Sequence, residues 1–162
     1  MEFGSTKSGL FAVADNSKLY SISPTTGQAS LIGATGVPIP FNTGSAVGLS
    51  NNSDILYMSS QTNLYSLNTG TGVASLIGST GTLQFNPMME LNGILYGGAA
   101  VPLQAIASLN TSTGHATQIA PITGVNGFIY ALAPVPEPST WMYMIAGLAI
   151  TSVIKKRKWH SI

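Results

Sequence analysis

The feature of this sequence that most restricts its fold is an internal repeat. Three segments of 15 residues align without gaps: Leu19–Gly33, Leu64–Gly78 and Ile106–Ala120. Successive copies begin 45 and 42 residues apart. In each copy a Thr-Gly pair separates two short runs in which apolar and small polar residues alternate. A period of two is typical of β-strands, and a glycine that ends a short connection is typical of a hairpin. Each repeat is therefore predicted to contain a β-hairpin.

Further strand-like segments flank the hairpins and extend each repeat to four strands. The second and third repeats have predicted strands at 46–50, 55–60, 64–68 and 74–79, and at 88–92, 94–99, 105–110 and 116–120. Four short antiparallel strands in about 40–45 residues is the plan of a β-propeller blade. The sequence therefore predicts an all-β fold of about three propeller-type, four-stranded antiparallel blades, in an incomplete propeller or a short stack. An irregular β-sandwich is the alternative.

The first repeat differs because only three strands are predicted in it, at 10–14, 19–23 and 29–34. Residues 1–9 are predicted to be disordered or non-native, which leaves the repeat domain at 10–133. An extra strand is predicted at Phe128–Leu132. It either completes the first blade by ring closure or belongs to a further blade. The repeats resemble those of bacterial exported propeller proteins with a Leu-Tyr…Asn-x-x-Thr-Gly…Ile-Gly pattern.

Composition excludes several functional classes. Charged residues make up 7% of the chain, and four of the six Lys and Arg residues stand together at 155–158. The rest of the chain therefore has no basic face for nucleic acid, and no nucleic-acid partner is predicted. The chain has no cysteine, so disulfides, Cys-zinc sites and cysteine nucleophiles are excluded.

Candidate catalytic residues are few and separated in the sequence. His115 lies in a predicted hairpin and His160 near the C-terminus. Asp15 and Asp54 stand in predicted turns, where an aspartate commonly bonds its own backbone. With no motif for a nucleophile, a metal or a phosphate, we predict no enzymatic activity, no catalytic residue, no metal and no cofactor. A carboxylate pair that the fold draws from Asp15, Asp54 and Glu90 and that acts on glycosides stays an open alternative.

Four tyrosines recur at related places in the repeats. Ring packing between blades is their expected use, and stacking on sugars is the alternative. They are Tyr20, Tyr57, Tyr65 and Tyr96.

The C-terminal segment has a different composition from the repeats. A Pro-rich linker at 134–140 precedes 14 residues, 141–154, that carry no charge. The cluster Lys155, Lys156, Arg157 and Lys158 follows. This order predicts a transmembrane helix at 141–154, stopped by a basic cytoplasmic tail at 155–162. The run is shorter than the roughly 20 residues of a typical span, so a buried core helix is the alternative.

This tail resembles the PEP-CTERM sorting signal, in which a Pro-Glu-Pro motif precedes a membrane helix and a basic C-terminus. Pro136, Glu137 and Pro138 stand at the motif positions. The resemblance implies a bacterial exosortase as processing partner, with Glu137 as a recognition feature. It also implies that the body is exported, held by the membrane helix before processing, and then placed at the cell surface or outside the cell. The related Gram-positive sortase tail requires Leu-Pro-x-Thr-Gly, which is absent.

We therefore expect a non-enzymatic exported surface or matrix protein. An exported protein that binds or hydrolyses polysaccharide is the alternative. Residues 1–9 do not have the basic start, apolar core and small-residue cleavage site of a signal peptide. We accordingly expect the native start to lie upstream of Met1.

Overall fold

The computed structural model describes residues 1–39, 47–51, 53–124 and 130–133. These residues are all-β, in one sheet of four strands and one of eight. The prediction of an all-β fold is therefore confirmed. The strands are β1 (Glu2–Thr6), β2 (Gly9–Val13), β3 (Lys18–Ile22), β4 (Ala29–Ala34), β5 (Val47–Asn51), β6 (Leu56–Ser60), β7 (Asn63–Leu67), β8 (Ala74–Ser79), β9 (Gln84–Leu91), β10 (Ile94–Val101), β11 (Ala105–Leu109) and β12 (Ala116–Pro121).

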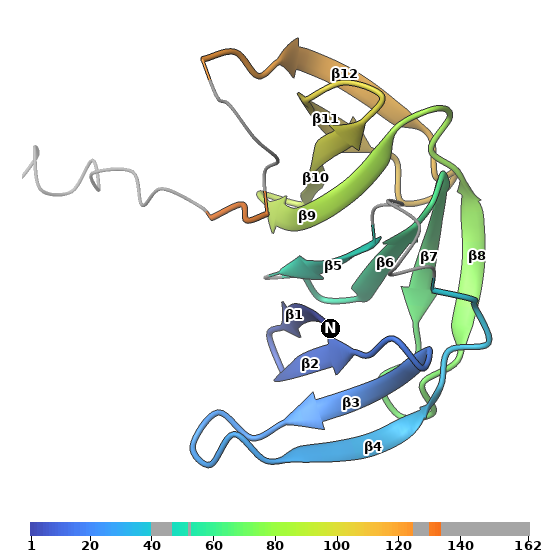
Figure 1. Ribbon diagram of the computed structural model, residues 1–162, viewed down its shortest axis with the longest axis vertical. Coiled ribbons are helices and arrows are strands. Elements are labelled where there is room, and N and C mark those ends of the chain that lie inside the picture. The colour runs from blue at the N-terminus through green and yellow to red at the C-terminus, as the bar shows by residue number, and fades with distance from the viewer. Residues whose placement is uncertain (40–46, 52, 125–129, 134–162) are drawn as a thin grey trace, which may run out of the picture.

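The strands form three four-stranded units in chain order. Unit 1 is β1–β4, unit 2 is β5–β8 and unit 3 is β9–β12, and within each unit every strand pairs antiparallel with the next. A short parallel pairing of β5 with β9 joins units 2 and 3 into the larger sheet. Units 1 and 2 are linked by a parallel bridge between Thr6 and Ser53. Figure 1 shows the units along an arc, with β1, β5 and β9 on its inner side and β4, β8 and β12 on its outer side.

The strands of the second and third repeats follow the sequence pattern closely. Their eight predicted strands are all present, and the largest shift is at β9, which begins at Gln84 where the pattern placed its start at residue 88. Alternation of apolar and polar residues therefore located these strands.

The first repeat was predicted incorrectly at its start. It has a first strand, because β1 (Glu2–Thr6) pairs along its whole length with β2. The expected disorder of residues 1–9 is thus wrong for these five residues. The pattern missed β1 because its sequence, Glu-Phe-Gly-Ser-Thr, buries only Gly4. An added Cβ at Gly4 would lie 2.5 Å from the Leu49 Cβ of β5, so tertiary contact with the next unit defines this strand.

The predicted extra strand at the end of the repeat domain is not formed in its described part. Tyr130, Ala131 and Leu132 lie outside any strand. Phe128 and Ile129 are outside the described residues. Because β1 supplies the first strand of unit 1, the alternative in which this segment completes that unit is not borne out. The alternative in which it belongs to a further blade stays a prediction.

The Thr-Gly pair of each repeat closes an outer hairpin, as predicted. Gly27, Gly72 and Gly114 all have positive φ, at 71°, 84° and 79°. This left-handed backbone is open to glycine at little cost. In the second hairpin, the Asn68 Oδ1 atom accepts hydrogen bonds from the N–H groups of Gly70 and Thr71, at 2.9 and 3.0 Å. Asn110 makes the same pair of bonds in the third hairpin.

The hydrophobic core lies between consecutive units. The first cluster, between units 1 and 2, contains Phe11, Val13, Leu19, Ile39, Leu49, Leu56, Met58 and Leu67. The second, between units 2 and 3, contains Tyr57, Leu64, Leu83, Phe85, Met88, Leu95, Ala99, Ala105, Ala107, Leu109 and Ala116. Unit 2 therefore contributes both faces of its sheet to the core, as expected for a strand layer covered on two sides.

Backbone-to-backbone contact marks both junctions between units at their outer end. At the first junction the Thr71-Gly72 turn of unit 2 lies on Gly33 of β4, and a Cβ at Gly33 would overlap the Thr71 carbonyl. At the second junction the Thr113-Gly114 turn of unit 3 lies in the same way on Gly78 of β8. The glycine that ends the first two repeats is thus required by the neighbouring unit.

The predicted linker, transmembrane helix and basic tail, at 134–140, 141–154 and 155–162, lie outside the described residues. Among the residues that the structure describes, no helix is long and apolar enough to cross a bilayer.

Candidate functional site

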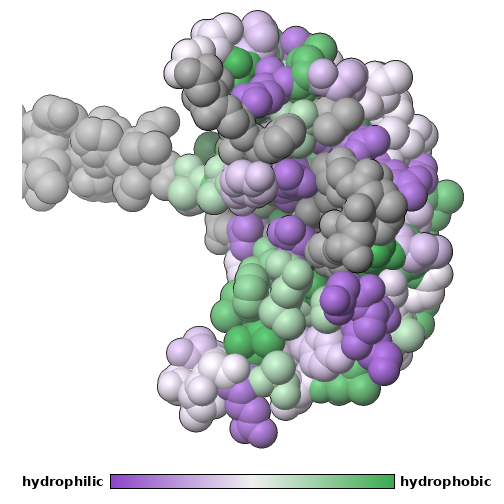
Figure 2. Space-filling view, in the orientation of Figure 1, coloured by the Kyte–Doolittle hydropathy of each residue, from purple (hydrophilic) through white to green (hydrophobic). Residues whose placement is uncertain are grey.

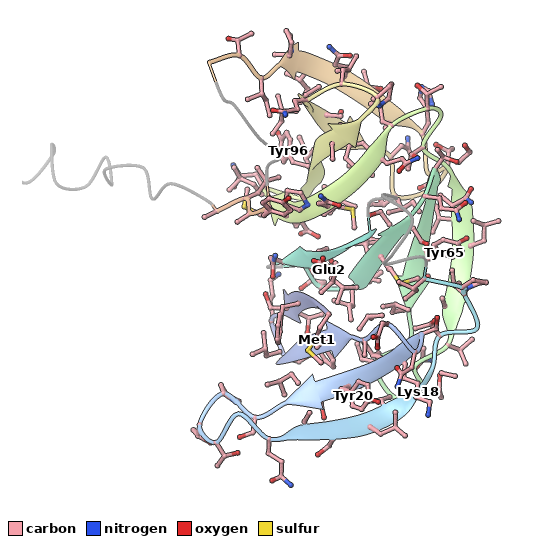
Figure 3. The ribbon with its side chains drawn as sticks, in the orientation of Figure 1. Met1, Glu2, Lys18, Tyr20, Tyr65 and Tyr96 are labelled. Carbon is pink, nitrogen blue, oxygen red and sulfur yellow. The ribbon has the colours of Figure 1, made fainter. Side chains whose placement is uncertain are left out.

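An open pocket lies at the inner edge of the arc, where the first strands of the three units come together. Its volume is about 260 Å³. Residues from the N-terminus and β1, from β5, from β9 and from the last described segment line it: Met1, Glu2, Phe3, Leu49, Asn51, Asn86, Pro87, Tyr130 and Ala131. Figure 3 shows Met1 and Glu2 on this side of the molecule, and Figure 2 shows apolar and polar surface mixed along the hollowed inner side of the arc.

Asn51 links the three inner strands beneath this pocket. Its Oδ1 atom accepts a hydrogen bond from the Ser5 hydroxyl of β1 at 3.4 Å. Its Nδ2 group donates to the Met88 carbonyl of β9 at 3.5 Å. The pocket floor therefore depends on contacts that cross both junctions, and it combines amide groups with the apolar side chains of Phe3 and Leu49.

Glu2 is the carboxylate among the residues that line the pocket. Partial burial raises the pKa of this carboxyl above its ordinary value, and the nearby N-terminal ammonium partly opposes the effect. Burial acts in this direction because it disfavours the charged form. The pocket thus holds an acid that is less readily ionised than a surface glutamate.

Replacement of Glu2 by glutamine is expected to make folding stability less dependent on pH. A carboxyl with a raised folded-state pKa contributes stability that is fully present below its unfolded-state pKa and is lost as pH rises through the folded-state value. The stability of Glu2→Gln relative to wild type should therefore increase from pH 4 to pH 7. Urea unfolding at several pH values measures this difference.

Ser5→Ala in the same strand is the control, because no titrating group is removed and its effect should not change with pH. A Glu2→Gln difference that stays constant from pH 4 to pH 7 would contradict the expectation.

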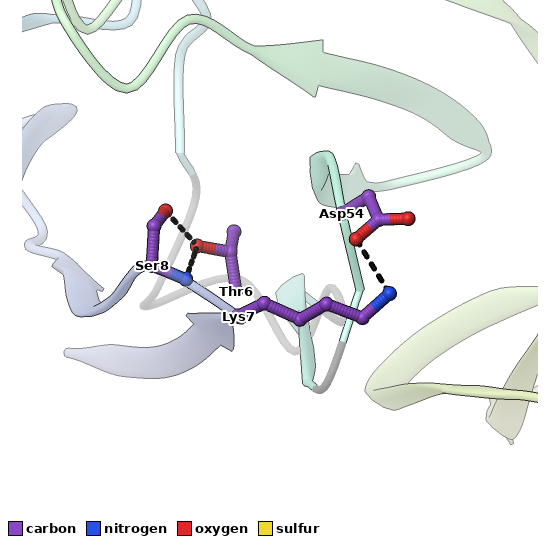
Figure 4. Close-up of polar contacts among 4 residues, drawn as sticks. All are labelled: Thr6, Lys7, Ser8 and Asp54. Atoms are coloured by element: carbon purple, nitrogen blue, oxygen red, sulfur yellow. Dashed lines mark hydrogen bonds and ion pairs between the residues drawn. The ribbon is translucent and has the colours of Figure 1, made fainter.

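The structure pairs Asp54, one of the three separated carboxylates, with a lysine. Lys7 Nζ lies 2.7 Å from the Asp54 Oδ1 atom, with both side chains about two-thirds exposed (Figure 4). The bond to Asp54, supported by the charges of Asp54 and Glu90, raises the pKa of Lys7. Exposed pairs of this kind contribute little to stability. Asp15 lies in the β2–β3 turn, as predicted, and Asp54 in the β5–β6 connection.

The remaining predicted residues have structural surroundings. His115 is exposed in the β11–β12 hairpin. Tyr57 is buried in the second cluster and Tyr65 packs on the first, which confirms the packing interpretation for these two rings. Tyr20 and Tyr96 are half-buried (Figure 3). Within the described ranges, no three His, Asp or Glu side chains are grouped so as to hold a metal ion.

Other predicted site residues lie outside the described part of the chain. These are the motif Pro136, Glu137 and Pro138, the basic cluster 155–158 and His160. Conversely, sequence reasoning did not find the pocket residues Glu2, Asn51 and Asn86. Their common feature, polar groups in or beside the first strand of each repeat, becomes visible only once β1 is recognised as a strand.

No protein-family model and no curated protein sequence matches this chain. Among solved structures, it is similar to a structural genomics protein of unknown function from Bacteroides thetaiotaomicron, with a TM-score of 0.60 and 16% identity. The match covers 80% of this chain, which spans 40% of the length of that protein. Two computationally designed proteins, Ika4 and Ika8, match with TM-scores of 0.47 and 0.48 at 17% and 18% identity. Each match covers 83% of this chain. It covers 78% of the length of Ika4 and 40% of the length of Ika8. The first likeness concerns the fold alone.

Proposed function

We propose that this chain is an exported, non-enzymatic surface or matrix protein with propeller-type blades, sorted through its C-terminal segment. The observation that carries the proposal is the order of three elements in the tail. Pro136-Glu137-Pro138 comes first, an uncharged run at 141–154 follows, and four basic residues at 155–158 end it. The similarity of this order to the PEP-CTERM signal supports exosortase as the partner.

The arrangement of the units supports the propeller-type reading of the body. Each unit is a four-stranded antiparallel meander, and consecutive units place their first strands side by side on the inner side of an arc (Figure 1). The units pack face to face through a hydrophobic layer. Radial repetition of such sheets is the architecture of propellers.

The tail chemistry is consistent with recognition by a membrane enzyme. Two prolines separated by one residue favour an extended backbone without a helical hydrogen-bond pattern. Such a segment is ordered at low entropic cost when an enzyme binds it. A basic cluster after an apolar run favours an orientation with the C-terminus in the cytoplasm and the repeat domain outside.

Loss of Glu137 is expected to prevent processing without unfolding the repeat domain. The chain, preceded by a functional signal peptide, is expressed in bacterial hosts with and without exosortase. In the host with the enzyme, the wild-type C-terminus should be removed or modified, and Glu137→Ala should keep its full mass. Mass spectrometry of the C-terminal peptide and cell fractionation measure the two outcomes. Identical mass and location of the wild type in both hosts would reject the sorting proposal.

Asp54→Ala is the matched control, because it removes one exposed carboxylate from the body and leaves the tail unchanged. It should be processed like the wild type. Processing lost equally in both variants would point to a general effect of the lost charge.

A second candidate function is binding of extracellular polysaccharide, and the inner pocket is the observation that favours it. Its amides Asn51 and Asn86, the acid Glu2 and the exposed Tyr130 ring are groups that bind sugars through hydrogen bonds and stacking. Titration of the purified chain with glycans distinguishes the two candidates. Surface location that depends on the tail, without glycan binding, supports the first.

A further inference from the structure

The two junctions inside the molecule show what covers each face of a unit. In units 1 and 2, one sheet face is covered by the unit that follows in the chain, and the Thr-Gly turn of that following unit lies on the glycine that ends the repeat. Unit 3 has one face of this kind without a following unit among the described residues. Unit 1 likewise has a face without a preceding unit among them. The repeat alignment and strand pairing identify the residues on these two end faces.

The end face of unit 3 carries apolar residues whose equivalents are covered. Ile106 corresponds to Leu19 and Leu64, which are fully buried, but is itself half-buried. Ile119 corresponds to Ile32 and Ile77, which pack on the first and second clusters. Ile119 is 55% exposed. The face that would receive a next unit is therefore apolar and accessible.

The end face of unit 1 also carries apolar residues that are more exposed than their equivalents in unit 2. The strand pairing makes Phe3 the equivalent of Leu49, since each lies opposite the residue that pairs with the repeated tyrosine. Leu49 is 1% exposed at the first junction, whereas Phe3 is 53% exposed. Leu10 and Ile22, the equivalents of the buried Leu56 and Leu67, are half-buried.

The outer turn of unit 1 also has no neighbouring unit in contact with it in the described part of the chain. A Cβ at Gly27 would meet no described atom within 4 Å. A Cβ at the equivalent Gly72 or Gly114 would lie 2.7 or 2.5 Å from the backbone of the preceding unit. The turn of unit 1 is thus accessible, whereas the equivalent turns of units 2 and 3 each lie on a strand of the preceding unit.

We propose that the two end faces fit each other, so that a second copy of this chain binds head to tail, and that residue 120 sets the strength of this contact. Each copy has one end face on unit 1 and one on unit 3. The two internal junctions show how two such faces pack together. Heterologous contacts of this type close a ring when the rotation allows it and otherwise continue as an open chain. The arc in Figure 1 turns its two end units toward the same side, as ring closure requires.

Residue 120 departs from the junction pattern in a way that weakens the contact. Gly33 and Gly78 are the residues on which the next turn lies, and the third repeat has Ala120 in their place. By the internal geometry, the Ala120 methyl group would overlap the Thr26 carbonyl of a second copy. The backbones must then separate, and overpacking of this kind weakens a packed contact. Ala120 therefore makes association between copies weaker than association between units of one chain.

Ala120→Gly is expected to increase self-association of the full chain about tenfold or more in dissociation constant, because it removes this overlap. Sedimentation equilibrium in detergent, across a concentration series, measures the constant for wild type and variant. Ala34→Gly is the matched control, since it makes the same substitution at an exposed position of an outer strand. It should associate like the wild type.

Gly27→Asn in the Ala120→Gly background tests the other side of the contact. Asparagine tolerates positive φ, and the added side chain has space in the isolated chain but not at a junction. The double variant should return to wild-type association or below while keeping its thermal unfolding temperature. An Ala120→Gly chain that associates no more than wild type, or an association that survives Gly27→Asn, would overturn the proposal. Tighter association of Ala34→Gly by the same factor would overturn it too.

Discussion

Replacement of Gly78 by alanine is expected to destabilise the repeat domain by about 3 kcal/mol or more. The added Cβ would overlap the Thr113 carbonyl, and the contact is between two backbones, which cannot move aside as a flexible side chain can. Relief requires unit 3 to shift away from unit 2. That shift opens the cluster in which Leu64, Phe85 and Leu109 are almost fully buried. Because packed interiors lose contact energy over small gaps, the cost exceeds that of one methyl group.

Equilibrium urea unfolding measures the loss of stability. Thermal unfolding should show a decrease in melting temperature of about 10 °C for a domain of this size. Gly70→Ala is the matched control. It is the same substitution, in the turn of the β7–β8 hairpin that also contains Gly78, but its Cβ would lie 3.4 Å from its nearest neighbour, which is an ordinary contact. Thr25 and Ser112 stand at the equivalent positions of the other repeats. Gly70→Ala should thus be close to neutral, and equal effects of the two variants would contradict the role assigned to Gly78.

This glycine also illustrates what the sequence could reveal about the fold. The 15-residue repeat showed that Gly33 and Gly78 recur, and alternation predicted the hairpins correctly. It did not show that the two glycines contact the neighbouring unit, because a contact between residues 38 or 35 positions apart leaves no local pattern. The same reason explains why β1 was missed. Its residues do not alternate, and Gly4 is buried by Leu49 of the next unit.

The candidate site was less predictable than the fold. Sequence reasoning considered acids, histidines and tyrosines by residue type, and the structure places most of them in turns, on exposed surface or in the core. The pocket residues Glu2, Asn51 and Asn86 are brought together by three strands from three units. No spacing of residues in the sequence predicts this pocket, because each strand supplies only one or two of its residues. The tail motif, in contrast, is contiguous and is visible from sequence alone.

Phe85→Ala is the second change expected to have a large effect. Phe85 is the largest of the completely buried side chains and belongs to the cluster between units 2 and 3. Truncation of a buried phenylalanine typically costs about 3–5 kcal/mol, from lost transfer energy and from the cavity left behind. Folded domains have only about 5–15 kcal/mol of stability, so this variant should be close to unfolding. Leu76→Ala on the outer strand, where Leu76 is 63% exposed, is the control and should lose little.

Gly97 makes the Phe85 prediction specific to this packing. A Cβ at Gly97 would lie 2.5 Å from the Cδ1 atom of the Phe85 ring and 3.0 Å from the Leu109 Cδ1 atom. Gly97→Ala alone should therefore destabilise the protein by overpacking. In the Phe85→Ala background the ring is gone and the added methyl group fills part of the cavity, so the same substitution should be much less harmful. A double-mutant cycle by urea unfolding measures this coupling, and contacting residues typically give about 0.5–3 kcal/mol. Additive effects of the two substitutions would show that the ring does not occupy the space above Gly97, and the arrangement of this core would then need to be revised.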